Sequence, residues 1–121
     1  MRELKTGDKN PQTIVLALDE PEFGGNHLYS VLPINANVTQ ETPVPFLIFQ
    51  KGGRVKAGVN GLTHEEVLAA LIDRYDSFQA GPMACEENAT VLDLLNKALT
   101  AELERKARRI AAATEGTSKG N

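Results

Sequence analysis

The chain has 121 residues and a mass of 13.1 kDa, which suits one domain or a small domain with an appendage. Hydrophobic residues make up 41% of it and charged residues 24%, which excludes a disordered composition, and no apolar run reaches the roughly 18 residues that a membrane span needs. The net charge of −3 argues against general coating of nucleic acid.

The N-terminus and the single cysteine bear on the cellular compartment. Met1 to Asp8 contain no apolar stretch, so no secretory signal is visible there. Cys85 alone excludes an internal disulfide framework and suits a reducing environment. We therefore expect a cytoplasmic protein with no membrane partner.

The first half of the chain predicts a small β-sheet. Apolar, β-branched and aromatic residues predict strands over 13–18, 27–32 and 46–50, separated by loops that contain glycine and proline. Lys51–Arg54 is typical of a hairpin turn, after which Val55–Ala57 is predicted to return as a short fourth strand.

The second half predicts two helices. Thr63 is a good N-cap and forms a capping box with Glu66, which starts a helix over 63–79. Gly81 and Pro82 end it, and a second helix follows over 84–112. The fold class is therefore α+β: a small N-terminal antiparallel β-sheet followed by a long two-helix antiparallel hairpin. We expect one compact unit with three segments: a β-rich segment (1–58), the hairpin (59–113) and a flexible polar tail (114–121).

The two predicted helices differ in length. At about 1.5 Å per residue they span roughly 25 Å and 43 Å, so that the last three or four turns of the second helix lack a helical partner. Leu103, Ala107 and Ile110 nevertheless continue its apolar stripe. We expect both the N-terminal sheet and another copy of the chain to cover that stripe.

No motif for catalysis or metal binding stands out in the sequence. His27 and His64 are isolated, and Cys85 has no histidine near it. The paired glycines match neither phosphate-loop pattern, and the paired carboxylates sit at predicted helix starts, where capping explains them. We expect neither an enzyme nor a protein with a cofactor or a metal.

Four strings in the second half are distinctive: GVNGLT at 58–63, LIDRY at 71–75, FQAGPMACEENA at 78–89 and EGT at 115–117. Together they resemble the hairpin shared by two phage anti-defence families, the anti-CBASS protein 2 family and the Thoeris anti-defence 1 family. The resemblance covers about residues 46–117. The β-rich segment before the hairpin resembles the Thoeris branch. The stretch before EGT departs from the usual pattern of these hairpins.

The resemblance implies a non-catalytic sponge that works in the cytoplasm of the bacterial host. Such a protein binds a defence signal and holds it intact, so that the effector is never activated. The implied ligand is a cyclic ADP-ribose isomer, glyco-cyclic ADP-ribose, which TIR-domain enzymes make. A homo-oligomer, dimer or hexamer, is implied as well, and some members are expected to hold cyclic di- or trinucleotides in a second pocket.

The matching motif positions imply site residues. By these positions, the resemblance implies nucleotide contacts at Phe78, Asn88 and Arg105. Arg109 and Arg54 are further candidates for the same ligand, and Thr117 is the candidate for the second pocket. A base can stack on an aromatic ring, a guanidinium group can stack or bind phosphate, and an amide can bind a base edge.

Each candidate has a structural alternative. Phe78 would equally cap the hairpin core, Asn88 would be a polar residue of the first helical turn, and the basic run near Arg105 would be a solvated helix end. A nucleic-acid-binding regulator or an oligomeric adaptor that uses this basic end are alternative functions, and a signal-degrading enzyme is another.

The spacing of two candidates has a geometric consequence. Asn88 and Arg105 lie 17 residues apart on one predicted helix, which is about 25 Å along its axis. A single nucleotide cannot bridge that distance. If both residues touch one ligand, Arg105 must come from a second subunit whose helix runs antiparallel to the first, and we therefore expect pockets at subunit boundaries.

Overall fold

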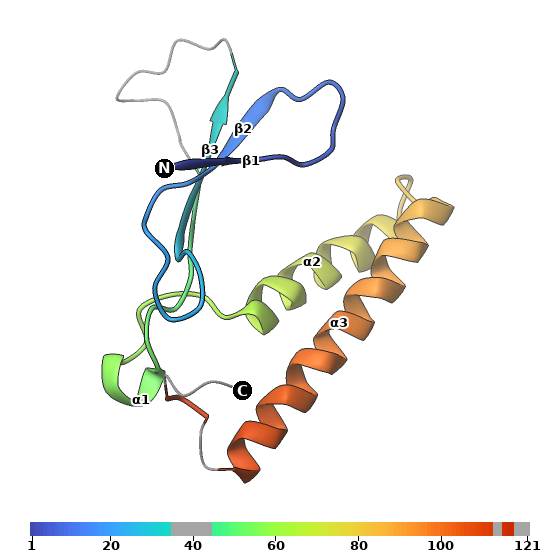
Figure 1. The fold of residues 1–121 in the computed structure, drawn as a ribbon. Helices are drawn as coiled ribbons and strands as arrows, with labels where there is room; N and C mark the ends of the chain where they lie inside the picture. The colour runs from blue at the N-terminus through green and yellow to red at the C-terminus, as the bar shows by residue number, and fades with distance from the viewer. Residues whose placement is uncertain (35–44, 113–114, 118–121) are drawn as a thin grey trace. The chain divides into compact units, whose positions relative to one another are not determined.

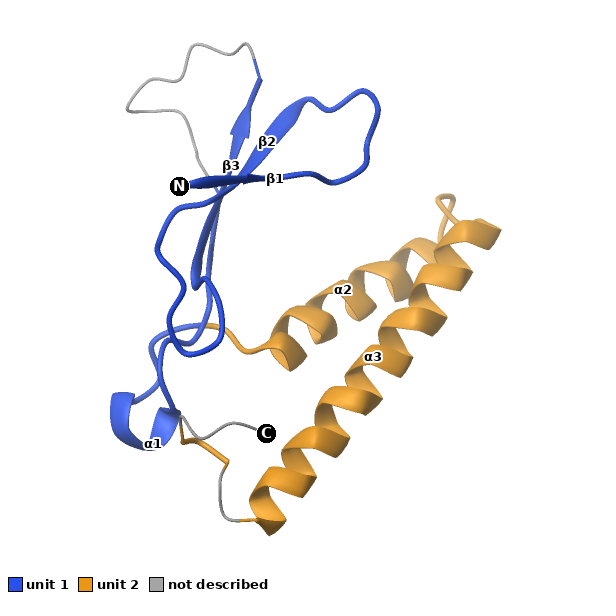
Figure 2. Ribbon diagram, in the orientation of Figure 1, with its two compact units in different colours: residues 1–61 blue, residues 62–121 orange. Residues whose placement is uncertain are grey.

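The computed structural model describes residues 1–34, 45–112 and 115–117. The chain divides into two compact units, residues 1–61 and residues 62–121 (Figure 2). The first contains a four-stranded antiparallel sheet and the second contains two long helices (Figure 1). The predicted α+β class is confirmed. The loop expected before the strand at 46–50 lies mostly outside the described residues, as do residue 113 of the expected hairpin and residues 114 and 118–121 of the expected tail.

The sheet follows chain order, with each strand antiparallel to the next. Its strands are β1 (Arg2–Leu4), β2 (Thr13–Ala17), β3 (Leu28–Pro33) and β4 (Phe46–Ile48). The three predicted strands are confirmed as β2, β3 and β4. In the register of the central pair, Val15 faces Val31 and Leu16 faces Ser30.

The chain buries little apolar surface. Among the described residues, Ala17 is the only hydrophobic side chain that is buried. Ser30 of the neighbouring strand is also buried, but it pairs with Leu16 and so lies on the other face of the sheet. All three residues of β4 are exposed and apolar. A chain of this size normally buries roughly two-thirds of its unfolded surface, so the buried core of the described residues is small for the length of the chain.

The predicted fourth strand at Val55–Ala57 is wrong, because these residues lie in the short helix α1 (Arg54–Ala57). The backbone N–H groups of Lys56 and Ala57 donate to the carbonyl of Gly53, which turns the chain instead of extending it. Gly58, with φ of 72°, ends the helix in a conformation that favours glycine. The fourth strand of the sheet is β1, which sequence patterning missed because its three residues are too few to show alternation.

Two side-chain amides clasp the loop that contains α1. Asn60 accepts the Lys51 N–H at 2.8 Å and donates to the Lys51 carbonyl at 2.8 Å, as a neighbouring strand would. Gln50 accepts the Asn60 N–H and donates to the carbonyl of Gly58 at 2.7 Å. The ends of the loop therefore stay together through hydrogen bonds, although few of its side chains are buried.

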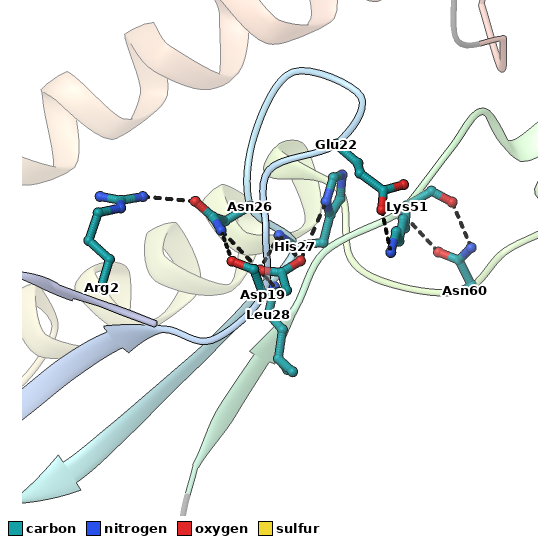
Figure 3. Close-up of polar contacts among 8 residues, drawn as sticks. All are labelled: Arg2, Asp19, Glu22, Asn26, His27, Leu28, Lys51 and Asn60. Carbon is teal, nitrogen blue, oxygen red and sulfur yellow. Dashed lines mark hydrogen bonds and ion pairs between the residues drawn. The ribbon is translucent and has the colours of Figure 1, made fainter.

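Asp19 organises the loop between β2 and β3 (Figure 3). Its carboxylate accepts backbone N–H groups from His27 and Leu28 and a side-chain N–H from Asn26. Asn26 in turn accepts from Arg2 of β1 at 2.8 Å. Burial acts to raise the pKa of Asp19, but the hydrogen bonds from Asn26, His27 and Leu28 outweigh it and hold the pKa below its ordinary value of 3.8.

This lowered pKa predicts that the loop loosens in acid. A carboxylate whose pKa is lower in the folded state stabilises that state above its unfolded pKa, and the contribution is lost as the pH falls through the folded value. We expect an NMR titration of the Asp19 carboxyl carbon to show a midpoint below 3.8, with the His27 and Leu28 amide protons losing protection in the same range. A titration midpoint of Asp19 at or above 3.8 would contradict the lowered pKa. If the His27 and Leu28 amide protons lost protection at the same pH in Asp19→Asn as in the wild type, Asp19 would not be the group responsible.

The second unit is an antiparallel pair of helices, α2 (His64–Gln79) and α3 (Glu86–Ala111). Thr63 is the N-cap of α2, as predicted, and its hydroxyl donates to the Glu66 carboxylate at 2.8 Å. Acidic residues in the first turn of each helix suit the helix dipole.

Two contacts between the helices show how far their pairing extends. His64 lies 3.2 Å from the Glu102 carboxylate and Glu65 lies 3.7 Å from the Lys106 ammonium group. The start of α2 therefore reaches residues 102–106 of α3 through long side chains. α3 has 26 residues and α2 has 16, so α3 is longer by ten residues, which is nearly three turns and close to the predicted overhang of three or four turns.

Candidate functional site

The turn between the helices is closed by a side-chain amide. Gln79 donates to the Cys85 carbonyl at 3.2 Å and accepts the Cys85 N–H at 3.1 Å. Asn88, in the first turn of α3, donates to the Met83 carbonyl at 3.0 Å. Two of the distinctive motif positions thus have a structural task, which is to fix the tip of the hairpin. Sequence reasoning attached no role to Gln79.

The Asn88 side chain can form hydrogen bonds in addition to this one. The bond to Met83 uses one of its two amide hydrogens, and Asn88 is half-buried beside the turn. Its carbonyl oxygen accepts no hydrogen bond from the described part of the chain. An amide held in this way can still bind a base edge or a sugar hydroxyl, so its role as a nucleotide contact stays a prediction.

Phe78 lies half-buried near the C-terminal end of α2. Its ring meets Tyr75 edge-on, with ring centroids 6.0 Å apart. The guanidinium carbon of Arg74 lies 5.2 Å from the Phe78 ring centroid, a cation–π contact that sequence reasoning missed. Arg74 therefore lies over one face of the ring, and the role of Phe78 as a base-stacking residue stays a prediction.

Arg105 lies on α3, and its side chain is exposed. Among the described residues it makes no ion pair or hydrogen bond, whereas its neighbour Lys106 pairs with Glu65. Asn88 and Arg105 are confirmed to lie on one continuous helix, about 25 Å apart along its axis. Within one protomer, therefore, Phe78 and Asn88 are at one end of the hairpin and Arg105 is toward the other.

Arg109 joins the end of α3 to the chain that follows it. Its side chain is only 4% exposed. The guanidinium Nε lies 3.4 Å from a Glu115 carboxylate oxygen, and Nη2 donates to the Thr117 carbonyl at 3.3 Å. The Glu115 N–H donates to the Arg109 carbonyl at 3.3 Å. The structure thus brings two predicted site residues together, with Arg109 fixing the backbone at Thr117.

Removing Arg109 is expected to release this segment. Arg109→Met keeps the length of the side chain but leaves the Glu115 carboxylate without its cation. Because Glu115 is partly exposed, we expect a loss of about 2 kcal/mol in the free energy of unfolding, below the usual value for a fully buried pair. Urea denaturation measures it, with Arg108→Met, an exposed neighbour, as the matched control. Equal stability of the two variants would contradict a structural role for Arg109.

Arg54 belongs to the first unit, at the start of α1. It is half-buried and donates from Nη2 to the Gly61 carbonyl at 3.3 Å. This bond adds a third link across the loop clasped by Gln50 and Asn60. Arg54 therefore occupies a fixed place on that loop, where a guanidinium group suits a phosphate.

The remaining candidate groups make ordinary contacts. His27 lies 3.9 Å from the Asp19 carboxylate, His64 contacts Glu102, and Cys85 is an exposed free thiol. Within the described ranges, no three histidine, cysteine or acidic residues are placed to hold a metal ion. Of the helices in these ranges, none has the length and apolar character for crossing a membrane.

Comparison with known proteins places the chain in a family. No family model matches it. It is 36% identical to a curated protein named Thoeris anti-defense 1 from Bacillus phage SBSphiJ7, over an alignment of 139 positions that includes 97% of this chain and 98% of the relative. Identity at this level over nearly the whole of both proteins supports the earlier resemblance: the chain belongs to the Thoeris anti-defence 1 family.

Proposed function

We propose that this protein counters Thoeris defence by capturing a nucleotide signal, glyco-cyclic ADP-ribose, and holding it chemically unchanged. With the signal made by the host's TIR-domain protein removed from solution, the effector stays inactive. The observation that carries the proposal is the full-length relationship to the phage protein named Thoeris anti-defense 1. The placement of aromatic, amide and guanidinium groups on the hairpin supports it.

The chemistry of these groups suits a nucleotide. In this proposal the ring of Phe78 stacks an adenine, Asn88 binds a base edge or a ribose hydroxyl, and the guanidinium of Arg105 covers the base or binds the pyrophosphate. Nanomolar capture corresponds to about −12 kcal/mol, which one stacked base and a few charge-assisted bonds reach when the site is already formed. None of these groups is a nucleophile or a general base, which suits binding without turnover.

A second copy of the chain completes the site in this proposal. Two α3 helices that run antiparallel bring Asn88 of one protomer to Arg105 of the other when the twofold axis passes near Asn96 and Lys97, midway between them. Leu94, which is 58% exposed, lies eleven residues before Arg105 and so on nearly the same face of α3. An exposed leucine beside the arginine suits a face that a partner covers.

The end of α3 supports the same conclusion. Ile110 stands eleven residues after Leu99 and so on nearly the same face of α3, beyond the start of α2, and Ile110 is 59% exposed. Together with the exposed apolar residues of β4, this surface suits coverage by a partner. We therefore propose a homo-oligomer, dimer or hexamer. A cyclic di- or trinucleotide pocket at Thr117, whose backbone Arg109 holds, is a subordinate part of the proposal.

Calorimetry with glyco-cyclic ADP-ribose, followed by heat denaturation and analysis of the released nucleotide, tests the proposal. We expect tight binding and recovery of the intact signal. Recovery of an altered nucleotide would indicate a degrading enzyme. Absence of both binding and thermal stabilisation would favour an adaptor, and DNA binding that weakens steeply with salt would favour a regulator.

A further inference from the structure

The loop between β2 and β3 has an unusual residue at its tip. Glu22 and Gly25 exchange backbone hydrogen bonds of 2.9 and 3.2 Å, which closes a two-residue turn of Phe23 and Gly24. Phe23 has φ of 50° and Gly24 has φ of 100°, both positive, as in a type I′ turn. Among the described residues, Phe23 is the only non-glycine with positive φ.

Phenylalanine is a poor choice for this position. The first central residue of a type I′ turn is normally asparagine, aspartate or glycine, since these adopt positive φ at least cost. Burial of the ring does not offset that cost, because Phe23 is 62% exposed. A residue that is both strained and exposed is expected where its side chain is needed for contact with something outside the fold.

The ring is held in place from several sides. Asp19 fixes one arm of the hairpin through the amides described above, and Glu22 pairs with Lys51 at 3.5 Å (Figure 3). The tip of the ring lies over Gly52, where an added Cβ would be 3.8 Å from it, and its edge faces His27 with ring centroids 6.4 Å apart. The ring is therefore presented on a fixed scaffold, so a ligand would meet little ordering cost.

The neighbours of the ring indicate the kind of ligand. Gly52 lies two residues before Arg54, on the loop whose ends are joined by the hydrogen bonds between Lys51 and Asn60. The β2–β3 loop carries the exposed ring, and the loop containing α1, which the Glu22–Lys51 pair links to it, carries the guanidinium group. These groups suit a nucleotide, because its base or sugar can pack on the ring while a phosphate binds the guanidinium. We propose that Phe23 contacts the nucleotide signal from the first unit, together with Arg54 of the same unit. This inference rests on the proposed function.

The turn geometry makes the test unusually selective. Phe23→Asn removes the ring but supplies the residue that a type I′ turn prefers, so the variant is expected to fold with a melting temperature equal to or above that of the wild type. Its affinity for glyco-cyclic ADP-ribose is expected to fall about tenfold or more, while its oligomeric mass is unchanged. Phe23→Tyr keeps the ring and is expected to bind within about threefold of the wild type.

The outcomes separate this inference from the function on which it rests. Normal binding by the wild type and by Phe23→Asn alike would overturn the contact role alone. A smaller oligomer in Phe23→Asn would also overturn it, because the ring would then pack against a second copy. No binding by the wild-type protein would overturn the proposed function and this inference with it.

Discussion

Phe78→Ala and Arg105→Ala are each expected to weaken capture of glyco-cyclic ADP-ribose by about a hundredfold, with the oligomer intact. Stacking of a base contributes about 1–3 kcal/mol, and a hydrogen bond to a charged group about 1.5–3 kcal/mol, so loss of either group falls in this range. Arg105 is exposed and makes no hydrogen bond or ion pair with the described residues, and Phe78 is only half-buried, so neither substitution removes much of the fold. Calorimetry measures the affinity, and light scattering measures the mass.

Matched variants make the comparison specific. Arg108→Ala removes an exposed arginine from the same helix, and Phe78→Tyr keeps the ring. Both are expected to bind within about threefold of the wild type. Unchanged affinity in both alanine variants would remove Phe78 and Arg105 from the site, and a loss in Arg108→Ala of equal size would show that charge alone, rather than position, is responsible.

Gly61→Ala is expected to be the most destabilising single substitution in the first unit. A Cβ at this position would lie 2.5 Å from the Phe49 carbonyl carbon and 2.7 Å from the Gln50 nitrogen, both of them backbone atoms. The loop clasped by Gln50 and Asn60 must shift to admit it, which we expect to cost about 3 kcal/mol and to lower the melting temperature by on the order of 10 °C.

Gly25→Ala is the control for this effect. Nothing lies within 4 Å of a Cβ built there, and its φ is not positive, so the added methyl group meets open space. We expect thermal unfolding of Gly25→Ala to differ from the wild type by less than about 1 kcal/mol. If Gly61→Ala unfolds at the same temperature as Gly25→Ala, the close approach at Phe49 is not a feature of the protein in solution.

Local patterning was enough to predict most of the fold. The strands at β2, β3 and β4 are runs of β-forming residues bounded by turns. Thr63 is the N-cap of α2 as predicted, but the predicted capping box is wrong, because the Thr63 hydroxyl donates to the Glu66 carboxylate and makes no side-chain cap bond to the backbone. β1 was beyond such reasoning, because its three residues become a strand only through pairing with β2. The strand predicted at 55–57 failed because the bonds to Gly53 and the clasp at Asn60, which bend this loop, involve partners that periodicity does not reveal.

The candidate site was predictable in composition but not in its contacts. Motif positions pointed to Arg109 and Thr117 separately, and the structure joins them through a fold-back of the chain that no helical pattern encodes. Arg74 over Phe78 and the Gln79 bridge to Cys85 were missed for the same reason, since both depend on rotamers at the hairpin tip. Phe23 carried a sequence signal, a bulky residue before two glycines, but the signal acquires meaning only with its positive φ.

The central claim, that two protomers build each nucleotide site together, is tested most directly by mixing variants. Phe78→Ala and Arg105→Ala proteins, each expected to bind about a hundredfold more weakly than the wild type, are unfolded, combined and refolded, and the mixture is titrated with glyco-cyclic ADP-ribose. Half of the random pairs hold one of each chain, and in these one of the two sites has both residues intact, so about a quarter of all sites should regain wild-type affinity. A mixture that binds no better than the separate variants would contradict the claim.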